Sequence, residues 1–279
     1  MRSEKERSEI MIADSHTALY GVFGDPVSHS LSPVMHNSGF SHIGYNGVYL
    51  AFRVKDIAAG VSSIKALDIR GVSVTIPHKV AVMEFLDELD DMAKQIGAVN
   101  TVINRDGILS GYNSDCLGAI SALAEKTDIR GKKTGIIGAG GAARAIGFGI
   151  RSERGNVAIV NRSADKGEKL AADIGAEFCP LSDIEKLGCE ILINTTPLGM
   201  TPNIETTPIP IRYLEKGMVV MDIVYNPLKT RLLKEAEAAG CTTIDGVAMF
   251  VYQGAFQFEL WTGEKAPVEV MREAVMRET

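Results

Sequence analysis

Three serines at alternate positions, in the stretch SHSLSP, stand immediately before a segment with helical character. Pro33 favours a helix start, and Ser32 in front of it carries the hydroxyl of a good helix N-cap. That interpretation leaves Ser30 without a role. The alternative is that Ser30 and Ser32, together with the amides of a helix N-terminus, bind an anion such as a carboxylate. Both interpretations are open from this stretch alone.

A glycine-rich turn gives the strongest local signal for a ligand. In TGIIGAGGAARAIG an apolar strand leads into a turn and then a helix, and the turn comprises Gly138, Ala139, Gly140, Gly141, Ala142 and Ala143. The first glycine permits a tight turn, the second lets the backbone approach a pyrophosphate, and a small third residue permits close helix packing. The helix N-terminus then faces the phosphates. This order of elements predicts a dinucleotide site.

The end of the next strand, NVAIV, indicates which dinucleotide binds. An acidic residue there would accept hydrogen bonds from the ribose of NAD. The chain instead has Asn161, the cations Arg162 and Lys166, and the hydroxyl of Ser163. These groups suit a 2′-phosphate and favour NADP(H). The ordinary alternative is solvated charge at a strand–helix junction.

A hydride transfer needs a group that manages a proton. Tyr225 and Lys229 have the spacing of a Tyr-x-x-x-Lys pair, but Pro227 between them argues against the helix that such a pair needs.

The first half of the chain offers better candidates for that group. Lys79 follows the strand SVTIP, and Asp115 lies in GYNSD at the boundary between the two halves. A lysine near a carboxylate can pass a proton. Thr75 and Asn100 lie on neighbouring apolar runs. Taken singly, these residues are also ordinary: a solvated lysine, a helix cap, or side chains that satisfy turn backbone.

Alternating strand and helix patterns position these candidates in the first half. We expect strands at 18–24, 47–54 and 69–77, helices at 33–44, 56–67 and 80–97, and a hairpin over 98–115 that turns at Asp106-Gly107.

The second half begins near 128–133. Its predicted strands, at 134–138, 156–160, 190–195, 219–224 and 241–246, are separated by helical stretches at first, which is typical of a doubly wound parallel sheet. No strand is predicted after 246, and the final helices are expected to pack back on the first half.

Composition excludes several classes of function. The chain has 279 residues, 46% hydrophobic and 23% charged, with a net charge of −6, which argues against a nucleic-acid surface. No apolar run is long enough for a membrane span, and MRSEKERSEI is too charged for a signal peptide, so residues 1–16 are expected to form a solvated flexible tail.

Cysteine and histidine usage points the same way. The four cysteines form no C-x-x-C pair, which suits a reducing cytoplasm, and the five histidines lack metal-ligand spacing, so no metal site is expected.

The ordered motifs SHSLSP, VTIPHK, GAVNT, GYNSD, GAGGAAR, NRS, NTTPLGM and DIVYNP resemble the shikimate dehydrogenase family from about residue 19 to the C-terminal helices. The resemblance implies NADPH-dependent reduction of 3-dehydroshikimate to shikimate in aromatic amino-acid biosynthesis. It implies a substrate domain, 17–116 joined by 247–279, and a Rossmann domain, 117–246, with a cleft between them. A homodimer is left open.

The resemblance also assigns roles to residues. Lys79 and Asp115 would be the catalytic pair, which also contacts the substrate, and Ser30 and Ser32 would bind the substrate carboxylate. The remaining substrate-site residues would be Thr75, Asn100, Tyr225 and Gln253. Thr195, Val224 and Gly246 would join the glycine turn and the residues Asn161, Arg162, Ser163 and Lys166 in holding the cofactor.

Three departures from the family pattern are conservative. Ser73 stands where the family usually has Asn, N-S-D-C replaces N-T-D-G, and N-R-S replaces N-R-T. Cys116 in place of glycine is expected to shift the hinge backbone slightly.

Three alternatives remain in view. An NAD-preferring quinate/shikimate dehydrogenase would need an acid at the second strand end. Methylenetetrahydrofolate dehydrogenase lacks the S-x-S-P stretch. A non-catalytic regulator would not need both Lys79 and Asp115.

Overall fold

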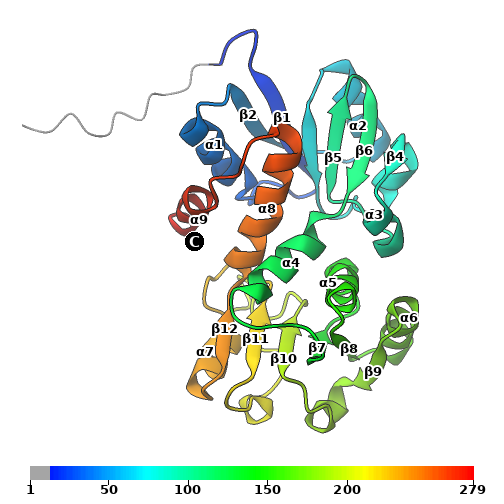
Figure 1. Cartoon of the computed structure of the whole chain (residues 1–279), viewed down its shortest axis with the longest axis vertical. Coiled ribbons are helices and arrows are strands. Elements are labelled where there is room, and N and C mark those ends of the chain that lie inside the picture. Colours follow the sequence, from blue (N-terminus) through cyan, green and yellow to red (C-terminus); the bar gives the residue numbers. More distant parts are fainter. Residues whose placement is uncertain (1–12) are drawn as a thin grey trace, which may run out of the picture.

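The computed structural model describes residues 13–279 and builds two α/β halves around two six-stranded sheets (Figure 1). Of the predicted tail at 1–16, residues 1–12 lie outside the described residues. The two-domain α/β prediction is confirmed. Within residues 13–279, none of the helices combines the length and the apolar character needed to cross a membrane.

The first sheet has the strand order β2-β1-β3-β5-β6-β4, with the bounds Gly47–Arg53, Ala18–Gly24, Gly71–Val74, Thr101–Arg105, Ile108–Tyr112 and Glu88–Leu89. β1 pairs in parallel with β2 and β3, whereas β5 runs antiparallel to β3 and β6. The predicted hairpin is present. Asp106 and Gly107 both have positive φ, as a type I′ turn requires.

Helices cover both faces of the first sheet. One face carries α1 (Ser32–Ile43), α8 (Gly246–Thr262) and α9 (Val268–Met276), and the other carries α2 (Ile57–Ala66), η1 (Ala81–Phe85) and α3 (Asp91–Ile96). Adjacent residues of β1 point to opposite faces of the sheet, because Val22 packs with α1, α8 and α9, whereas Phe23 packs with α2, η1 and α3. The C-terminal helices therefore pack back on the first half, as predicted.

The single helix predicted over 80–97 is wrong. The segment forms η1, the short strand β4 and α3 instead. Two aspartates interrupt the helix. Asp87 accepts a hydrogen bond from the Leu109 amide, and Asp90 caps α3 by accepting from the amides of Met92 and Ala93. Short acidic side chains offer the backbone such alternatives to helix.

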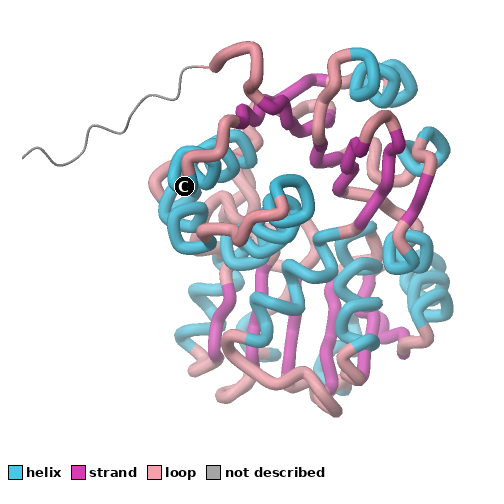
Figure 2. The backbone as a smooth tube through the Cα atoms, turned by 45° about the horizontal axis from the view of Figure 1, so that its top comes forward, coloured by secondary structure: helices cyan, strands magenta, loops and turns pink. Residues whose placement is uncertain are grey.

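The second sheet is entirely parallel and has the order β12-β11-β10-β7-β8-β9 (Figure 1), and its strands lie side by side in Figure 2. The strands span Thr242–Ile244, Val219–Asp222, Ile191–Asn194, Lys133–Ile137, Asn156–Asn161 and Glu177–Pro180. The chain order reverses between β7 and β10, which is the doubly wound arrangement. β9 was not predicted, because it is a four-residue edge strand without a fully buried residue.

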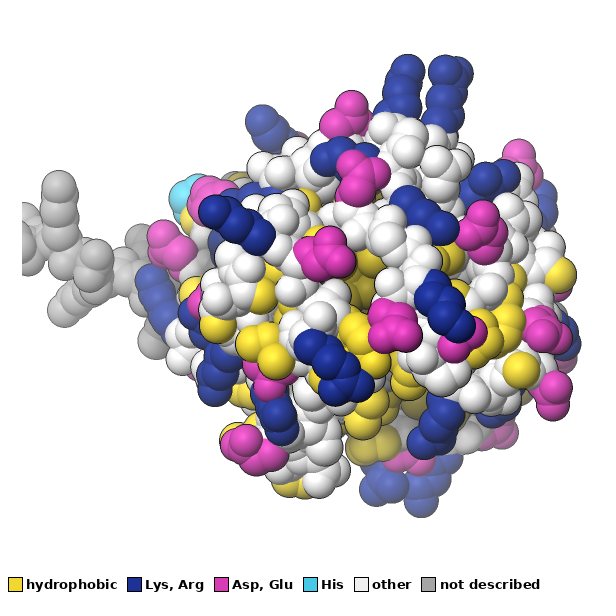
Figure 3. Space-filling view, turned by 90° about the horizontal axis from the view of Figure 1, so that it is seen from below, with side chains coloured by type: hydrophobic (Ala, Val, Ile, Leu, Met, Phe, Trp, Pro, Cys, Tyr) yellow, Lys and Arg dark blue, Asp and Glu magenta, His cyan; other side chains and the backbone are white. Residues whose placement is uncertain are grey.

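The second sheet is covered by α4 (Ser114–Ala124), α5 (Gly141–Ser152) and α6 (Ala164–Ile174) on one face, and by η2 (Leu181–Lys186), η3 (Ile211–Tyr213) and α7 (Arg231–Ala238) on the other. On the surface of the molecule that Figure 3 shows from below, lysine and arginine side chains are interspersed with acidic side chains.

The two halves are joined by α4 and α8, which pack against each other (Figures 1 and 2). A Cβ on Gly118 of α4 would lie 2.8 Å from both the Gln253 Cβ and the Met249 carbonyl oxygen. Glycine at this position therefore permits the close approach of the two helices.

Candidate active site

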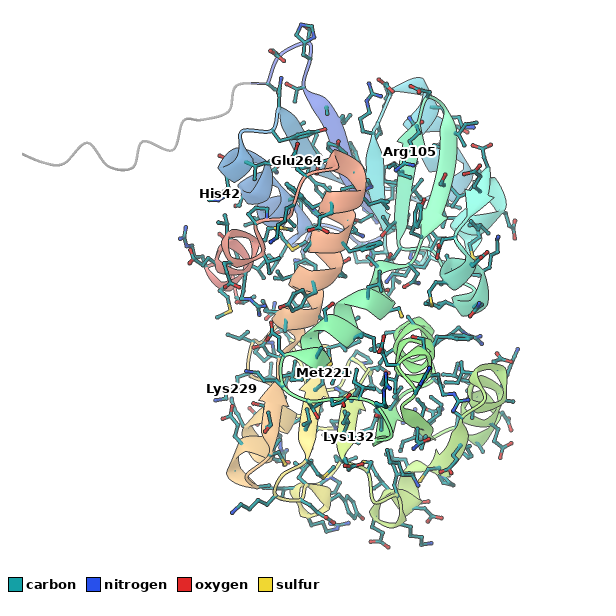
Figure 4. All side chains as sticks on the ribbon, viewed as in Figure 1. His42, Arg105, Lys132, Met221, Lys229 and Glu264 are labelled. Carbon is teal, nitrogen blue, oxygen red and sulfur yellow. The ribbon has the colours of Figure 1, made fainter. Side chains whose placement is uncertain are left out.

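The predicted site residues come from facing edges of the two sheets. In the first sheet they follow the ends of β1, β3 and β6 or precede the start of β5. In the second they follow the carboxyl ends of the parallel strands. Met221 near the end of β11 lies nearer the first sheet than Lys132, which precedes β7 (Figure 4). Ligands of open parallel sheets bind outside this carboxyl edge.

Lys79 and Asp115 form an ion pair at the edge of the first sheet. The Lys79 Nζ donates to the Asp115 Oδ2 at 2.6 Å, and both side chains are partly covered, at 28% and 13% exposure. The Asn100 Nδ2 donates to the other carboxylate oxygen at 2.8 Å. One carboxylate therefore holds a lysine ammonium and an amide in fixed directions.

Local backbone contacts explain the position of Lys79. The Thr75 amide donates to the Phe23 carbonyl at 2.9 Å, and the Lys79 carbonyl accepts from the Val99 amide at 2.8 Å. The buried His78 ring lies 2.6 Å from the Val54 carbonyl oxygen, within hydrogen-bond distance. These contacts fix the loop after β3 on both sides of the lysine.

Asp115 is placed by a helix cap. The Asn113 side chain accepts from the amides of Asp115 and Cys116, so α4 begins with Asp115 in its first turn. Asn100 reaches the same turn, because its Oδ1 accepts from the Ser114 amide at 2.8 Å. The Ser114 hydroxyl also donates to the Gln253 Oε1 at 3.2 Å. Gln253 thus joins the group around Asp115.

The serine stretch differs from the predicted cap. Leu31 occupies the N-cap position of α1 and Ser32 is the first helical residue, so Ser32 is not the cap. The Ser30 hydroxyl accepts from the Ser32 amide at 3.3 Å, so Ser30 takes the local turn contact. Ser32 is buried and Ser30 is half-buried, and both lie at the α1 N-terminus. An anion there would meet two hydroxyls and helix amides.

Two predicted substrate-site residues lie outside the hydrogen-bonded group. Thr75 is half-buried, and its methyl group would lie 2.4 Å from a Cβ on Gly24, so a glycine is needed there. Tyr225 follows β11 and stacks on Phe250 of α8, with ring centroids 5.0 Å apart. Burial raises the pKa of Tyr225.

The glycine turn after β7 has the shape of a phosphate cradle. Gly138 has φ of 120°, and a Cβ there would lie 2.5 Å from the Thr195 Oγ1. A Cβ on Gly140 or Gly141 would instead point into open space at the N-terminus of α5, which no side chain caps. The space and the first-turn amides fit a pyrophosphate. Ala143 is fully buried, as predicted for the small third position.

The residues after β8 present positive charge to solvent. Arg162, Ser163 and Lys166 are exposed, and within residues 13–279 neither cation forms an ion pair, whereas the nearby Arg144 is paired with Asp173. The Asn161 Nδ2 donates to the Ser163 carbonyl at 2.9 Å and holds the turn. This unpaired positive edge fits a 2′-phosphate.

The remaining predicted cofactor residues line the same edge. The Thr195 hydroxyl donates to the Ile137 carbonyl at 2.7 Å, and a Cβ on Gly246 would lie 2.6 Å from the Val224 carbonyl oxygen. Below them Asp222 is fully buried and accepts from Asn194, Thr230 and the Val224 amide. Burial raises the pKa of Asp222 to about 6 despite these donors.

Sequence reasoning did not assign four residues that complete the polar group. Tyr49, Thr101, Ser114 and Gln257 are buried and hydrogen-bonded around Ser73 and Asn100. The one available signal was polar side chains on otherwise apolar strands and on the apolar helix α8.

A separate cavity of about 590 Å³ is lined by Tyr20, Arg70, Arg105 and the end of α8. Arg105 and Glu264 mark the end of the first sheet that is remote from the second sheet (Figure 4). None of the predicted site residues lines this cavity.

Family models match the chain in three segments. Their descriptions are the shikimate dehydrogenase substrate binding domain for residues 22–102, shikimate/quinate 5-dehydrogenase for residues 121–223, and the shikimate 5′-dehydrogenase C-terminal domain for residues 246–276.

Whole proteins are similar over nearly the full chain. Shikimate dehydrogenase (NADP(+)) of Methanopyrus kandleri is 47% identical over 94% of this chain and 96% of its own length. A crystal structure of shikimate dehydrogenase in complex with NADP⁺ is 42% identical, with a TM-score of 0.93 over 96% of this chain and 97% of that one. The Thermus thermophilus shikimate 5-dehydrogenase in complex with NADP(H) and shikimate is 34% identical, with a TM-score of 0.89 over 94% and 100%.

Proposed function

The chain belongs to the shikimate dehydrogenase family, and we propose that it catalyses the reversible NADPH-dependent reduction of 3-dehydroshikimate to shikimate. The observation that carries this proposal is the hydrogen-bonded group formed by Lys79, Asp115 and Asn100 at one edge of the first sheet. The reaction belongs to the biosynthesis of aromatic amino acids.

NADP(H) is the cofactor that the nucleotide edge fits. The open space beside Gly140 and Gly141 would take the pyrophosphate, and the unpaired Arg162 and Lys166, with the Ser163 hydroxyl, would hold the 2′-phosphate. NADPH, when bound, supplies the hydride of the reduction.

Lys79 would act as the proton donor. The carbonyl oxygen of a ketone gains negative charge during reduction and must end with a proton, which an ammonium group can stabilise and then supply. The Asp115 carboxylate, 2.6 Å from the Lys79 Nζ, orients the ammonium and can accept a hydrogen bond from the neighbouring substrate hydroxyl. In the oxidation direction the same pair receives the proton.

The other predicted residues would orient the substrate. Ser30 and Ser32 would donate to its carboxylate from the α1 N-terminus, as the two half-buried or buried hydroxyls there allow. Asn100 and Gln253, which lie in the Asp115 group, would contact the ring hydroxyls. Thr75 and Tyr225 would line the same cleft.

Three further assignments accompany this function. We propose a substrate domain of 17–116 joined by 247–279 and a nucleotide domain of 117–246. A cytoplasmic location is supported by four cysteines that are all free. A homodimer stays a prediction.

The test measures reduction of the nicotinamide by its absorbance, with each of the two substrates shikimate and quinate combined with each of the two cofactors NADP and NAD. We expect the highest kcat/KM with shikimate and NADP. A preference for quinate with NAD would favour the catabolic alternative. Without turnover of shikimate or quinate, turnover of methylenetetrahydrofolate would favour methylenetetrahydrofolate dehydrogenase, and no turnover of any of the three would favour a non-catalytic regulator.

A further inference from the structure

Gln257 is a buried polar residue on the apolar helix α8 that the proposed mechanism does not use. Its side chain is 1% exposed and lies one turn after Gln253. A buried carboxamide is costly unless its donors and acceptor are satisfied. The partners that satisfy Gln257 come from two strands of the first sheet.

The carboxamide of Gln257 bridges β3 to the start of β5. Its Oε1 accepts from the Ser73 hydroxyl at 2.8 Å. Its Nε2 donates to the Thr101 Oγ1 at 2.9 Å and to the Asn100 backbone carbonyl at 3.3 Å. The Ser73 hydroxyl in turn accepts from the Tyr49 hydroxyl at 2.7 Å.

The Asn100 backbone carbonyl determines which atoms donate and which accept in these hydrogen bonds. The Asn100 backbone carbonyl can only accept, so the amide nitrogen of Gln257 must face it. The Oε1 then faces Ser73, which must donate its only proton there and accept from Tyr49. On the other side, Thr101 accepts from Gln257, so its proton is free for the Asn100 Oδ1 at 2.7 Å.

This direction continues into the site. The Asn100 Oδ1 is occupied by the Thr101 hydroxyl and the Ser114 amide, which leaves the Asn100 Nδ2 to donate to Asp115. Asp115 holds Lys79. We infer that Gln257 is a positioning residue that fixes the side chain of Asn100, through Thr101 and the Asn100 backbone, for the proposed reduction of 3-dehydroshikimate; the inference rests on that function.

The first test compares Gln257→Met with Trp261→Phe by steady-state kinetics of shikimate oxidation. Met keeps the length of the side chain and removes all three hydrogen bonds. Trp261 is the matched control, because its Nε1 donates to the Val102 carbonyl at 3.0 Å and so also joins α8 to β5, without contacting Asn100. We expect Gln257→Met to lower kcat about 10-fold, with the KM for NADP unchanged, because networks of buried hydrogen bonds act cooperatively. Trp261→Phe should lower the melting temperature and leave kcat within about two-fold, since rates follow the groups that hold the reacting atoms.

Two further variants separate positioning from folding. Thr101→Val removes the hydroxyl between Gln257 and Asn100 and should lower kcat similarly, and the double variant should lose less than the product of the two. Gln257→Glu should regain activity relative to the parent as the pH falls from 8 to 6, because a buried carboxylic acid then carries the proton that the Asn100 carbonyl requires.

The outcomes distinguish a failure of this inference from a failure of the proposed function. If the parent is active and both Gln257→Met and Thr101→Val keep its kcat, this inference alone is overturned. Losses equal to that of Trp261→Phe would also overturn it. A parent that turns over neither shikimate nor quinate would overturn the proposed function and this inference with it.

Discussion

The Lys79 ammonium lies 2.6 Å from the Asp115 carboxylate, although the two residues are 36 positions apart and belong to different structural contexts. Lys79 leaves the end of β3 in a loop, and Asp115 sits in the first turn of α4. Loop and helix meet because both follow strands that end at the same edge of the first sheet. The pair is therefore placed by the sheet and not by local sequence.

Lys79→Ala should lower kcat by about 10²–10⁴-fold, because it removes the proposed proton donor. The KM for NADP should change little. Asp115→Asn should lower kcat as well, and the double variant should lose less than the product of the single losses. Lys65→Ala, which breaks an exposed ion pair with Asp87, is the control. Steady-state kinetics on variants with unchanged circular dichroism measure the effect, and a Lys79→Ala enzyme with nearly full kcat would contradict the mechanism.

Replacing both Ser30 and Ser32 by Ala should raise the KM for shikimate far more than that for NADP. Hydrogen bonds to a charged group carry about 1.5–3 kcal/mol each. Ser28→Ala is the matched control, since Ser28 belongs to the same stretch but is exposed. Binding titrations with shikimate give the result, and an unchanged affinity in the double variant would leave these serines with turn formation only.

Arg162→Ala should weaken NADP binding by about 10-fold or more and leave NAD binding nearly unchanged, because NADP alone carries the 2′-phosphate. Lys169→Ala, at an exposed position of the helix α6 that follows Arg162 in the chain, should affect neither cofactor. Fluorescence titration with each cofactor is the measurement. Equal losses for NADP and NAD would show that Arg162 stabilises the turn and does not select the cofactor.

His36 should make the stability of the protein depend on pH. The ring is fully buried and stacks on Tyr49, with centroids 4.5 Å apart, and neither ring nitrogen has a hydrogen-bond partner among the described residues. Burial lowers the pKa of His36 to about 3, and the neighbouring Gln257 offsets only part of the effect. The unfolded histidine titrates near 6.5, so the unfolded chain binds the proton first, and the free energy of unfolding should decline as the pH falls from about 6.5 toward 3.

His36→Phe keeps a flat ring and removes this titration. Urea unfolding at several pH values between 7 and 4 should give a shallower decline for the variant than for the parent. The slope with pH is the readout, whatever the overall stability of the variant. Equal slopes would exclude His36 as a source of acid sensitivity.

Gly149→Ala should destabilise the packing of α5 against α4, the helix that joins the second half to the first through α8. A Cβ there would lie 2.7 Å from the Cys116 Sγ and 2.9 Å from the Ile120 Cγ1, so α4 and α5 would have to separate. Overpacking of this kind costs about 1–3 kcal/mol. Cys116→Ala in the same background should recover part of the loss of melting temperature. If the second change gives no recovery, the contact does not limit stability.

The local motifs were predictable because each has its own chemistry. The glycine turn and the Asp106-Gly107 hairpin need particular backbone angles, and their residue types indicate these angles. The structure of segment 80–97 was not predictable in this way. Its apolar residues have helical spacing, but Asp87 accepts a hydrogen bond from the Leu109 amide of a neighbouring strand, and Asp90 starts a separate short helix by capping it. Tertiary hydrogen bonds overrode local periodicity there.

The buried part of the site lay beyond sequence reasoning for a related reason. Gln257 and Thr101 are 156 positions apart, and no local pattern links them. A glutamine in an apolar helix does not by itself indicate whether its side chain is buried or exposed, so the sequence of α8 did not mark Gln257 as a site residue. Its partners follow only from the register of β3 with β5 and from the face of α8 that covers them.

The packing of α8 and α9 on the first sheet has a consequence for the nascent chain. Phe258, Trp261 and Met271 complete the core around Tyr20 and Phe40, so the first half lacks one wall of its core until α8 and α9 have been synthesised. The strands β7–β12 form a continuous stretch of chain and can assemble earlier. The second half could therefore fold before the first, although its chain is made later.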